Sequence, residues 1–149
     1  MPKKGQNPLI SHTILIGIGV LLILSVVVTM NTVKSNYDEF VGEEEMDIVC
    51  SLIRHAINEM YMPSSYQVQS DTLTGKIVLN LPDRIGDSVY KARFINDSLK
   101  IETYGSLKIN RTCLIGFNAS YSGLTSGGRT KIMWTTLSNG SNRIEMVKI

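Results

Sequence analysis

A stretch without a single charged side chain, from Pro8 to Val33, constrains the fold of this 149-residue chain more than any other feature. An α-helix rises ~1.5 Å per residue, so a helix of this length can cross a hydrocarbon core of roughly 30 Å. Aliphatic side chains occur on every side of that helix, which leaves no polar face for a water-soluble fold to expose. The sequence therefore predicts a transmembrane helix over residues 6–33.

The charges on the two sides of this stretch predict its orientation. Lys3 and Lys4 precede it, whereas one lysine and then a run of acidic residues from Asp38 to Glu45 follow it. Because basic residues are retained on the cytoplasmic side, we expect a single-pass protein of the cell membrane with a cytoplasmic N-terminus and an extracellular C-terminal domain. A cleaved secretory signal is the alternative, but its apolar region is usually only ~7–15 residues long.

The residues in front of the helix resemble a known signal. Lys3-Lys4-Gly5-Gln6, followed directly by an apolar helix, resembles the class III signal peptide of archaeal type IV pilin-like proteins. The resemblance covers about the first 30 residues. It implies that a prepilin-type peptidase cuts after Gly5, so that residues 1–5 are a leader and Gln6 becomes the N-terminus. It also implies that the helix is kept, either in the lipid bilayer or in a filament core with other pilin-like subunits.

The chain departs from this family at one position. Family pilins commonly carry Glu at the fifth residue of the mature chain, where this chain has Ile10. In that family the Glu is associated with the assembly of subunits into filaments. Its replacement by Ile10 therefore favours a protein that does not polymerise. Ile10-Ser11-His12 at the start of the helix also resembles the pilin-like stator proteins of the archaeal motility filament. Two interpretations stay open: a structural subunit at the cell surface, and a stator-like binding module that contacts surface-layer protein or glycan.

Residues 34–63 have a helical pattern and an acidic composition. Apolar side chains recur at spacings of three and four between Val41 and Met60, and Pro63 ends the pattern. The segment has seven acidic and two basic residues, a balance of −5. The sequence predicts an acidic helical stalk. We expect Gly42 to be its weak point, because Gly costs about 1 kcal/mol relative to Ala inside a helix.

From residue 64 to 149 the apolar pattern changes to alternation, which is typical of strands with one buried face. The alternating segments are 66–70, 77–81, 89–94, 99–103, 132–136 and 144–149. The sequence predicts an α+β fold, in which a long N-terminal helix is followed by an antiparallel sheet or small sandwich of about six to eight strands. We expect the apolar face of helix 48–60 to pack against this exported head.

Turn signals separate the alternating segments. They are residues 73–75, 82–87, 96–97, 126–128 and 139–140. Asn139-Gly140 predicts a hairpin with a type I′ turn, which needs positive φ at both positions. The Gly-rich segment 122–128 lacks the Lys and the following helix of a phosphate-binding loop, so we expect a flexible loop there.

Cys50 and Cys113 are the two cysteines of the chain, and both lie on the side predicted to be exported. In an oxidising exterior they can form a disulfide between stalk and head. The alternative is two buried free thiols. Neither cysteine has the spacing of a zinc site. Successive carboxylates at 43–45 point in different directions on a helix, so we expect no metal site and no cofactor.

Four segments of the head match the acceptor pattern for N-glycosylation. They begin at Asn96, Asn110, Asn118 and Asn139. Because the predicted topology places the head outside the cell, we expect a glycoprotein in which at least one of these residues is modified.

The head offers no evident catalytic apparatus. Both histidines, His12 and His55, precede it, so it has no histidine to act as a general base, and we do not expect an enzyme. A membrane-anchored enzyme is kept only as a remote third alternative. Its eleven basic and six acidic residues give a balance of +5, but the charges are dispersed and lack a stacking motif. This argues against a nucleic-acid partner. The charge instead fits the acidic stalk or an anionic surface glycan.

Overall fold

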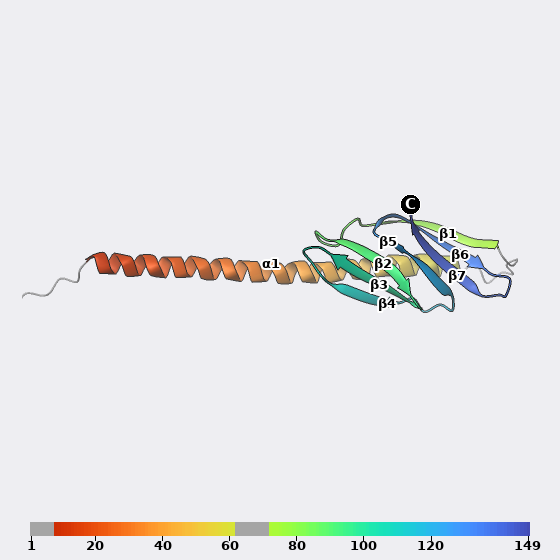
Figure 1. Ribbon diagram of the computed structural model, residues 1–149, viewed down its shortest axis with the longest axis horizontal. Helices are drawn as coiled ribbons and strands as arrows, with labels where there is room; N and C mark the ends of the chain where they lie inside the picture. The colour runs from red at the N-terminus through yellow and green to blue at the C-terminus, as the bar shows by residue number, and fades with distance from the viewer. Residues whose placement is uncertain (1–7, 62–71) are drawn as a thin grey trace, which may run out of the picture. The chain divides into compact units, whose positions relative to one another are not determined.

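The computed structural model describes residues 8–61 and 72–149 (Figure 1). The chain divides into two compact units, Met1–Tyr37 and Asp38–Ile149, which we describe separately and call the N-terminal unit and the head unit. Helix α1 runs from Pro8 to Tyr61 and contributes residues to both. Lys3-Lys4-Gly5-Gln6, where a processing site was predicted, and the alternating segment 66–70 lie outside the described residues.

In the N-terminal unit, α1 exposes its apolar side chains on all sides. Leu15 and Leu21, for example, are 70% and 67% exposed. Two hydroxyls in this part bond within the helix: Ser25 Oγ donates to the carbonyl of Leu22, and Thr29 Oγ1 donates to the carbonyl of Ser25, each at 2.8 Å. Polar groups satisfied inside their own helix are what a hydrocarbon environment requires.

The head unit contains one seven-stranded sheet. Its strands are β1 (Thr72–Leu81), β2 (Val89–Ile95), β3 (Ser98–Tyr104), β4 (Asn110–Leu114), β5 (Ser120–Thr125), β6 (Gly128–Thr136) and β7 (Asn142–Lys148). The strand order is β1-β6-β7-β5-β2-β3-β4. All neighbours are antiparallel except β5 and β7, which are parallel. The predicted α+β layout of a helix followed by a β head is therefore confirmed, with a mixed sheet in place of an antiparallel one.

Helix α1 covers one face of this sheet, and the core lies between the two layers. In Figure 1 the C-terminal part of α1, drawn in yellow, runs along the sheet. The buried helix residues recur every three or four positions and are Met46, Val49, Cys50, Ile53, Ala56, Ile57 and Met60. They meet the inward-facing residues of the strands, among them Ile101, Ile132 and Trp134. The indole Nε1 of Trp134 donates to Asn142 Oδ1 at 3.1 Å, which satisfies the buried ring nitrogen.

Two glycines permit close packing in the head unit. The helix continues without a break through Gly42, where a Cβ would lie 2.5 Å from Leu107 Cδ2 and 2.8 Å from Ile109 Cδ1. Gly42 is thus a packing position and not a break in the helix. Gly123 in β5 has a φ of +102°, and a Cβ there would collide with the carbonyl of Met146 in β7. The parallel β5–β7 pairing therefore depends on glycine at this position.

Three predictions about turns were wrong. Residues 73–75 belong to β1, whose pairing with β6 has a bulge between Leu73 and Gly75. Segment 122–128 is not a flexible loop, because β5 extends to Thr125 and β6 begins at Gly128. The β6–β7 hairpin exists, but residues 137–141 connect its strands, and Gly140 has positive φ (77°) while Asn139 does not. The two-residue type I′ turn is therefore absent from this hairpin.

Candidate functional site

The N-terminal part of α1 is long and apolar enough to cross a membrane. Its most apolar 18-residue window has a mean hydropathy of 2.7, and none of that window is buried by the rest of the chain. A single such helix near the N-terminus is compatible with membrane anchoring. His12 is exposed within this helix, whereas the side chain of Ile10 lies outside the described residues.

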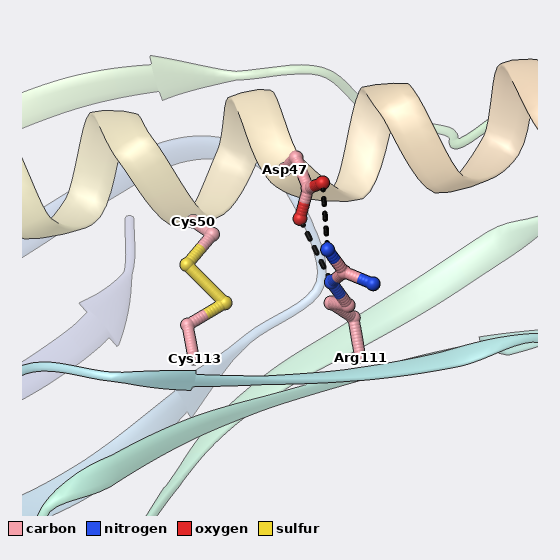
Figure 2. Close-up of a disulfide and its surroundings, with 4 residues drawn as sticks. All are labelled: Asp47, Cys50, Arg111 and Cys113. Carbon is pink, nitrogen blue, oxygen red and sulfur yellow. Dashed lines mark hydrogen bonds and ion pairs between the residues drawn. A yellow bond between two sulfur atoms is a disulfide. The ribbon is translucent and has the colours of Figure 1, made fainter.

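A disulfide joins helix α1 to the edge strand β4. Figure 2 shows Cys50 on the helix bonded to Cys113 on the strand, with their Cα atoms 6.3 Å apart. The two cysteines are 63 residues apart in sequence. The Cys50 and Cys113 residues are almost fully buried, so the bond lies inside the packed layer between helix and sheet. The disulfide links the helix layer covalently to the sheet layer of the head unit.

An ion pair lies one helical turn before this disulfide (Figure 2). Arg111 Nε and one of its terminal nitrogens donate to the two carboxylate oxygens of Asp47, each at 2.9 Å. Asp47 and Cys50 are three apart on the helix, and Arg111 and Cys113 are two apart on the strand, so each pair faces the other element. Both partners are about half exposed, so the ion pair adds little to stability. Its main effect is to fix the position of α1 relative to β4.

A second carboxylate of the acidic segment also contacts the sheet region. The backbone N–H of Gly86, in the loop after β1, donates to Glu45 Oε2. The sequence identifies residues 43–47 only as part of an acidic helical stalk. Two acids of that stalk, Glu45 and Asp47, fix the helix against the β1–β2 loop and β4. Their partners lie 41 and 64 residues away in sequence, so no local pattern could identify them.

The four glycosylation motifs occupy exposed positions on the head unit. Asn96 lies in the β2–β3 turn with a φ of +54°, and Asn110 is the first residue of β4. Asn118 lies between β4 and β5, and Asn139 lies between β6 and β7. The pairing of the strands places Asn96, Asn118 and Asn139 at one end of the sheet and Asn110 at the other.

The end of the sheet with three motifs is also the end at which α1 finishes. The ring of Tyr61, the last residue of α1, lies 5.0 Å from that of Phe117 and 5.2 Å from that of Trp134, centroid to centroid. At this end Asn139 Oδ1 accepts hydrogen bonds from the backbone N–H of Ser141 at 3.0 Å and from its hydroxyl at 2.6 Å. The Asn139 motif is thus folded into a tight loop.

The sheet face turned away from α1 carries a network of charged side chains on β2 and β3. Glu102 accepts from Lys100 Nζ at 2.7 Å and from Arg93 at 3.2 Å, and the hydroxyl of Tyr104 donates to it at 3.2 Å. The hydrogen bond from Lys100, with the positive charges of Lys100 and Arg93, holds the pKa of the Glu102 carboxyl below its usual value. Lys91 lies over the ring of Tyr104 at 5.6 Å.

An open groove of about 350 Å³ lies beside the helix and is lined by Ser51, Arg54, His55, Asn58, Ile115 and Phe117. His55 therefore borders a hollow of the head unit, which sequence reasoning did not foresee. Its Nε2 lies 3.2 Å from Glu59 Oε1, one turn along the helix. Over residues 8–61 and 72–149, no hydrogen bond joins His55 to a hydroxyl that it could activate.

Within the part of the chain that the structure describes, no three His, Cys, Asp or Glu side chains come together in a way that could hold a metal ion. The carboxylates of the acidic helix segment lie on different sides of α1. Two of them contact the partners described above, Glu45 with Gly86 and Asp47 with Arg111.

No curated protein and no solved structure matches this chain. A family model described as a family of unknown function (DUF7266) matches residues 1–145. The matched residues include α1, strands β1 to β6 and the first four residues of β7. The family model therefore covers both units. The chain is therefore a member of the DUF7266 family.

Proposed function

We propose that this protein is a pilin-like, single-pass subunit of the cell surface, whose exported β head makes contacts with neighbouring molecules. One observation carries the proposal: an uncovered apolar segment of membrane-spanning length continues, in the same helix, into a folded β unit. An apolar segment that the protein itself does not bury needs lipid or another apolar partner.

The disulfide supports an exported head. Disulfides persist in oxidising compartments and are rare in reducing cytosol. Cys50 and Cys113 are bonded to each other and lie in the head unit, on the C-terminal side of the apolar segment. The lysines before that segment agree with this orientation, because basic residues stay in the cytoplasm.

A stator-like role is the second candidate, and Ile10 favours it. The Glu that pilin-like proteins associate with assembly is replaced there by an aliphatic residue. Under this alternative the head stays at the membrane and grips surface-layer protein or glycan without polymerising. Electron microscopy of filaments sheared from the cells, with mass spectrometry of both fractions, separates the two roles. A structural subunit is recovered in filaments, whereas a stator-like module stays with the membrane.

Removal of the leader is the prediction that follows most directly from the resemblance to pilin-like proteins. Because Lys3-Lys4-Gly5-Gln6 abuts the apolar helix, we expect a prepilin-type peptidase to remove residues 1–5. Intact-mass analysis of protein isolated from its native membrane should show a chain that begins at Gln6. A Gly5→Val variant should keep the leader. Recovery of the full-length chain alone would remove the main support for a pilin-like protein.

Glycosylation is the second prediction that tests the exported head. We expect glycopeptides that contain at least one of Asn96, Asn110, Asn118 and Asn139, because all four are exposed. An Asn→Gln substitution at an occupied position should lower the intact mass by one glycan, while Asn80→Gln, outside any motif, should leave it unchanged. Unmodified peptides at all four positions would contradict the glycoprotein assignment.

A further inference from the structure

The sheet face turned away from α1, which we call the sheet outer face, carries most of the cations on the strands of the head unit. Its strand residues include seven cations and two acids, a balance of +5. These residues are Lys76, Lys91, Arg93, Lys100, Arg129, Lys131, Arg143, Glu102 and Glu145. The balance equals that of the whole segment from residue 64 to 149, so the sheet outer face accounts for the net charge of the head.

The strand order divides these charges into two groups. Strands β1, β6 and β7 lie side by side, and β5 separates them from β2 and β3 (Figure 1). On β2 and β3, Glu102 pairs with both Arg93 and Lys100. Lys91 lies over the ring of Tyr104. The β2–β3 group therefore already has partners inside the molecule.

The cations on β1, β6 and β7 form the second group, which we call the β1–β6–β7 patch. They are Lys76, Arg129, Lys131 and Arg143. Over the described ranges, none of the four has a carboxylate oxygen within ion-pair distance. Among the described residues of these three strands, Glu145 is the one acid on the same face. The patch is therefore the strongest uncompensated positive region of the sheet outer face.

The strand register places three cations of the patch close together. Lys76 is the partner of Met133 across the β1–β6 pair, and Lys131 is two residues from Met133 on β6. Diagonal neighbours of this kind lie roughly 7–8 Å apart. Arg129 lies two residues before Lys131 on the same face of β6, roughly 7 Å away. Like charges at these separations repel one another, so a bound anion would remove this repulsion as well as add an attraction.

The aliphatic side chains around the patch favour a hydrated anion over a lipid surface. Val78 and Val147 are the cross-strand neighbours of Lys131, and Val78 is 41% exposed. Lysine and arginine side chains are longer than valine, so the charged groups stand above the aliphatic ones. Binding in a lipid interface needs apolar side chains that reach the acyl boundary. A hydrated anionic polymer needs contact with the charged groups only.

Three open hollows of the head unit lie outside the patch. They are lined by residues between 51 and 58 with 115–117, by residues 102–110, and by Tyr61 with residues 118–120 and 140–142. None of these linings includes a residue of the patch. Protein partners are usually held by large side chains anchored in pockets, whereas an extended polyanion can bind a pleated surface through its charges. The patch fits the polyanion better.

We propose that the β1–β6–β7 patch binds an anionic glycan, a sugar polymer that carries carboxylate or sulfate groups. Arg129 and Arg143 can each donate two N–H groups to one such anion, and Lys76 and Lys131 add two point charges. The polymer form matters, because several weak contacts to neighbouring cations add up along one chain. This inference rests on the proposed exported head and names the partner that the head contacts.

Biolayer interferometry with immobilised polygalacturonate tests this site on the full chain, purified in micelles of an uncharged detergent. We expect binding at ~0.1 M salt that is at least about tenfold weaker near ~1 M salt, because the screening length falls from roughly 10 Å to roughly 3 Å. Dextran sulfate should compete with polygalacturonate, which extends the result from carboxylate to sulfate groups. Neutral dextran should not compete.

Two double variants locate the site, and each removes two positive charges from the sheet outer face. The patch variant carries Lys76→Gln and Arg129→Gln, and the matched control carries Lys91→Gln and Arg93→Gln. We expect the patch variant to bind at least about tenfold more weakly and the control to stay within about threefold of the wild type. Glu145→Gln removes the acid beside the patch and should tighten binding by about threefold, a gain that unfolding cannot produce. Far-ultraviolet circular dichroism checks the fold of each variant.

Equal losses in the two double variants would overturn the assignment to this patch, and so would a Glu145→Gln chain that binds no more tightly than the wild type. A wild-type chain that binds neither polyanion, or binds with no dependence on salt, would overturn an anionic ligand. Tighter binding to poly-L-glutamate at equal carboxylate concentration, or to vesicles of phosphatidylglycerol, would overturn the glycan as the partner. Any of these leaves the anchored, exported role intact, provided that the head is accessible on intact cells. A head that is inaccessible there overturns the proposed function itself.

Discussion

Replacing Cys50 and Cys113 together by Ala is expected to lower the free energy of unfolding of the head unit by about 4 kcal/mol. The disulfide links residues 63 apart in sequence, and a loop of that size strongly restricts the unfolded chain. Both residues lie in the core between α1 and the sheet, so the folded state also loses packing there. Denaturant unfolding of the full chain, followed by the fluorescence of its single tryptophan, Trp134, measures the change.

The matched control is the wild-type chain unfolded with a thiol reductant present. If the bond carries the effect, reduction should reproduce most of the loss, and the same reductant should leave the Ala variant unchanged. A difference below about 1 kcal/mol between oxidised and reduced wild type would mean that helix and sheet hold together without the bond.

Replacing Gly123 by Ala is expected to destabilise the head unit by about 3 kcal/mol or more. The φ of +102° is unfavourable for any residue with a Cβ, and the added Cβ would collide with the backbone carbonyl of Met146. A backbone atom in a paired strand cannot rotate away as a side chain can. The cost therefore falls on the parallel pairing of β5 and β7, and denaturant unfolding measures it.

The Gly140→Ala variant separates the cost of the positive φ from the cost of the collision with Met146 at Gly123. Gly140 also has positive φ (77°), but nothing lies within 4 Å of the position that its Cβ would occupy. It should cost only about 1–2 kcal/mol, from backbone conformation alone. Equal losses in the two variants would show that β7 moves aside to accept a side chain at residue 123, which would contradict the argument from close packing.

The apolar helix and most of the strands could be predicted from the sequence because their patterns are local. The uncharged stretch up to Val33 and the three- and four-residue spacing up to Met60 predict α1. Alternation predicts most of β2, β3 and β7 and the C-terminal halves of β1 and β6. Strands β4 and β5 read NRTCL and SYSGLT, where polar residues and glycine obscure the alternation, so neither strand was predicted.

The arrangement of the strands could not be predicted in the same way. Alternation fixes which face a residue occupies but not which strand lies beside it or in which direction. Strand β7 pairs with β6 by a hairpin and with β5 in parallel, and only the second contact requires glycine at residue 123. A glycine in a segment with Ser and Thr predicts a loop equally well, which is why 122–128 was misassigned.

The charged contacts of the head unit show the same limit. The sequence gives an acidic helical segment and a basic head, and their opposite charges predict attraction. It does not show that Asp47 pairs with Arg111, nor that Glu45 accepts from Gly86. It also does not show that the remaining cations collect on the face opposite the helix, because that needs the strand register.

Protease accessibility on intact cells tests the membrane-anchored, exported head most directly. The full chain, with an epitope tag at its C-terminus, is expressed in its native host, and any surface layer is removed before trypsin is added. The orientation predicted by Lys3 and Lys4 requires that the tag and the head are digested while a fragment with the apolar helix is retained in the membrane. A cytoplasmic protein of the same cells should stay intact. A tag protected until the membrane is lysed would contradict the account.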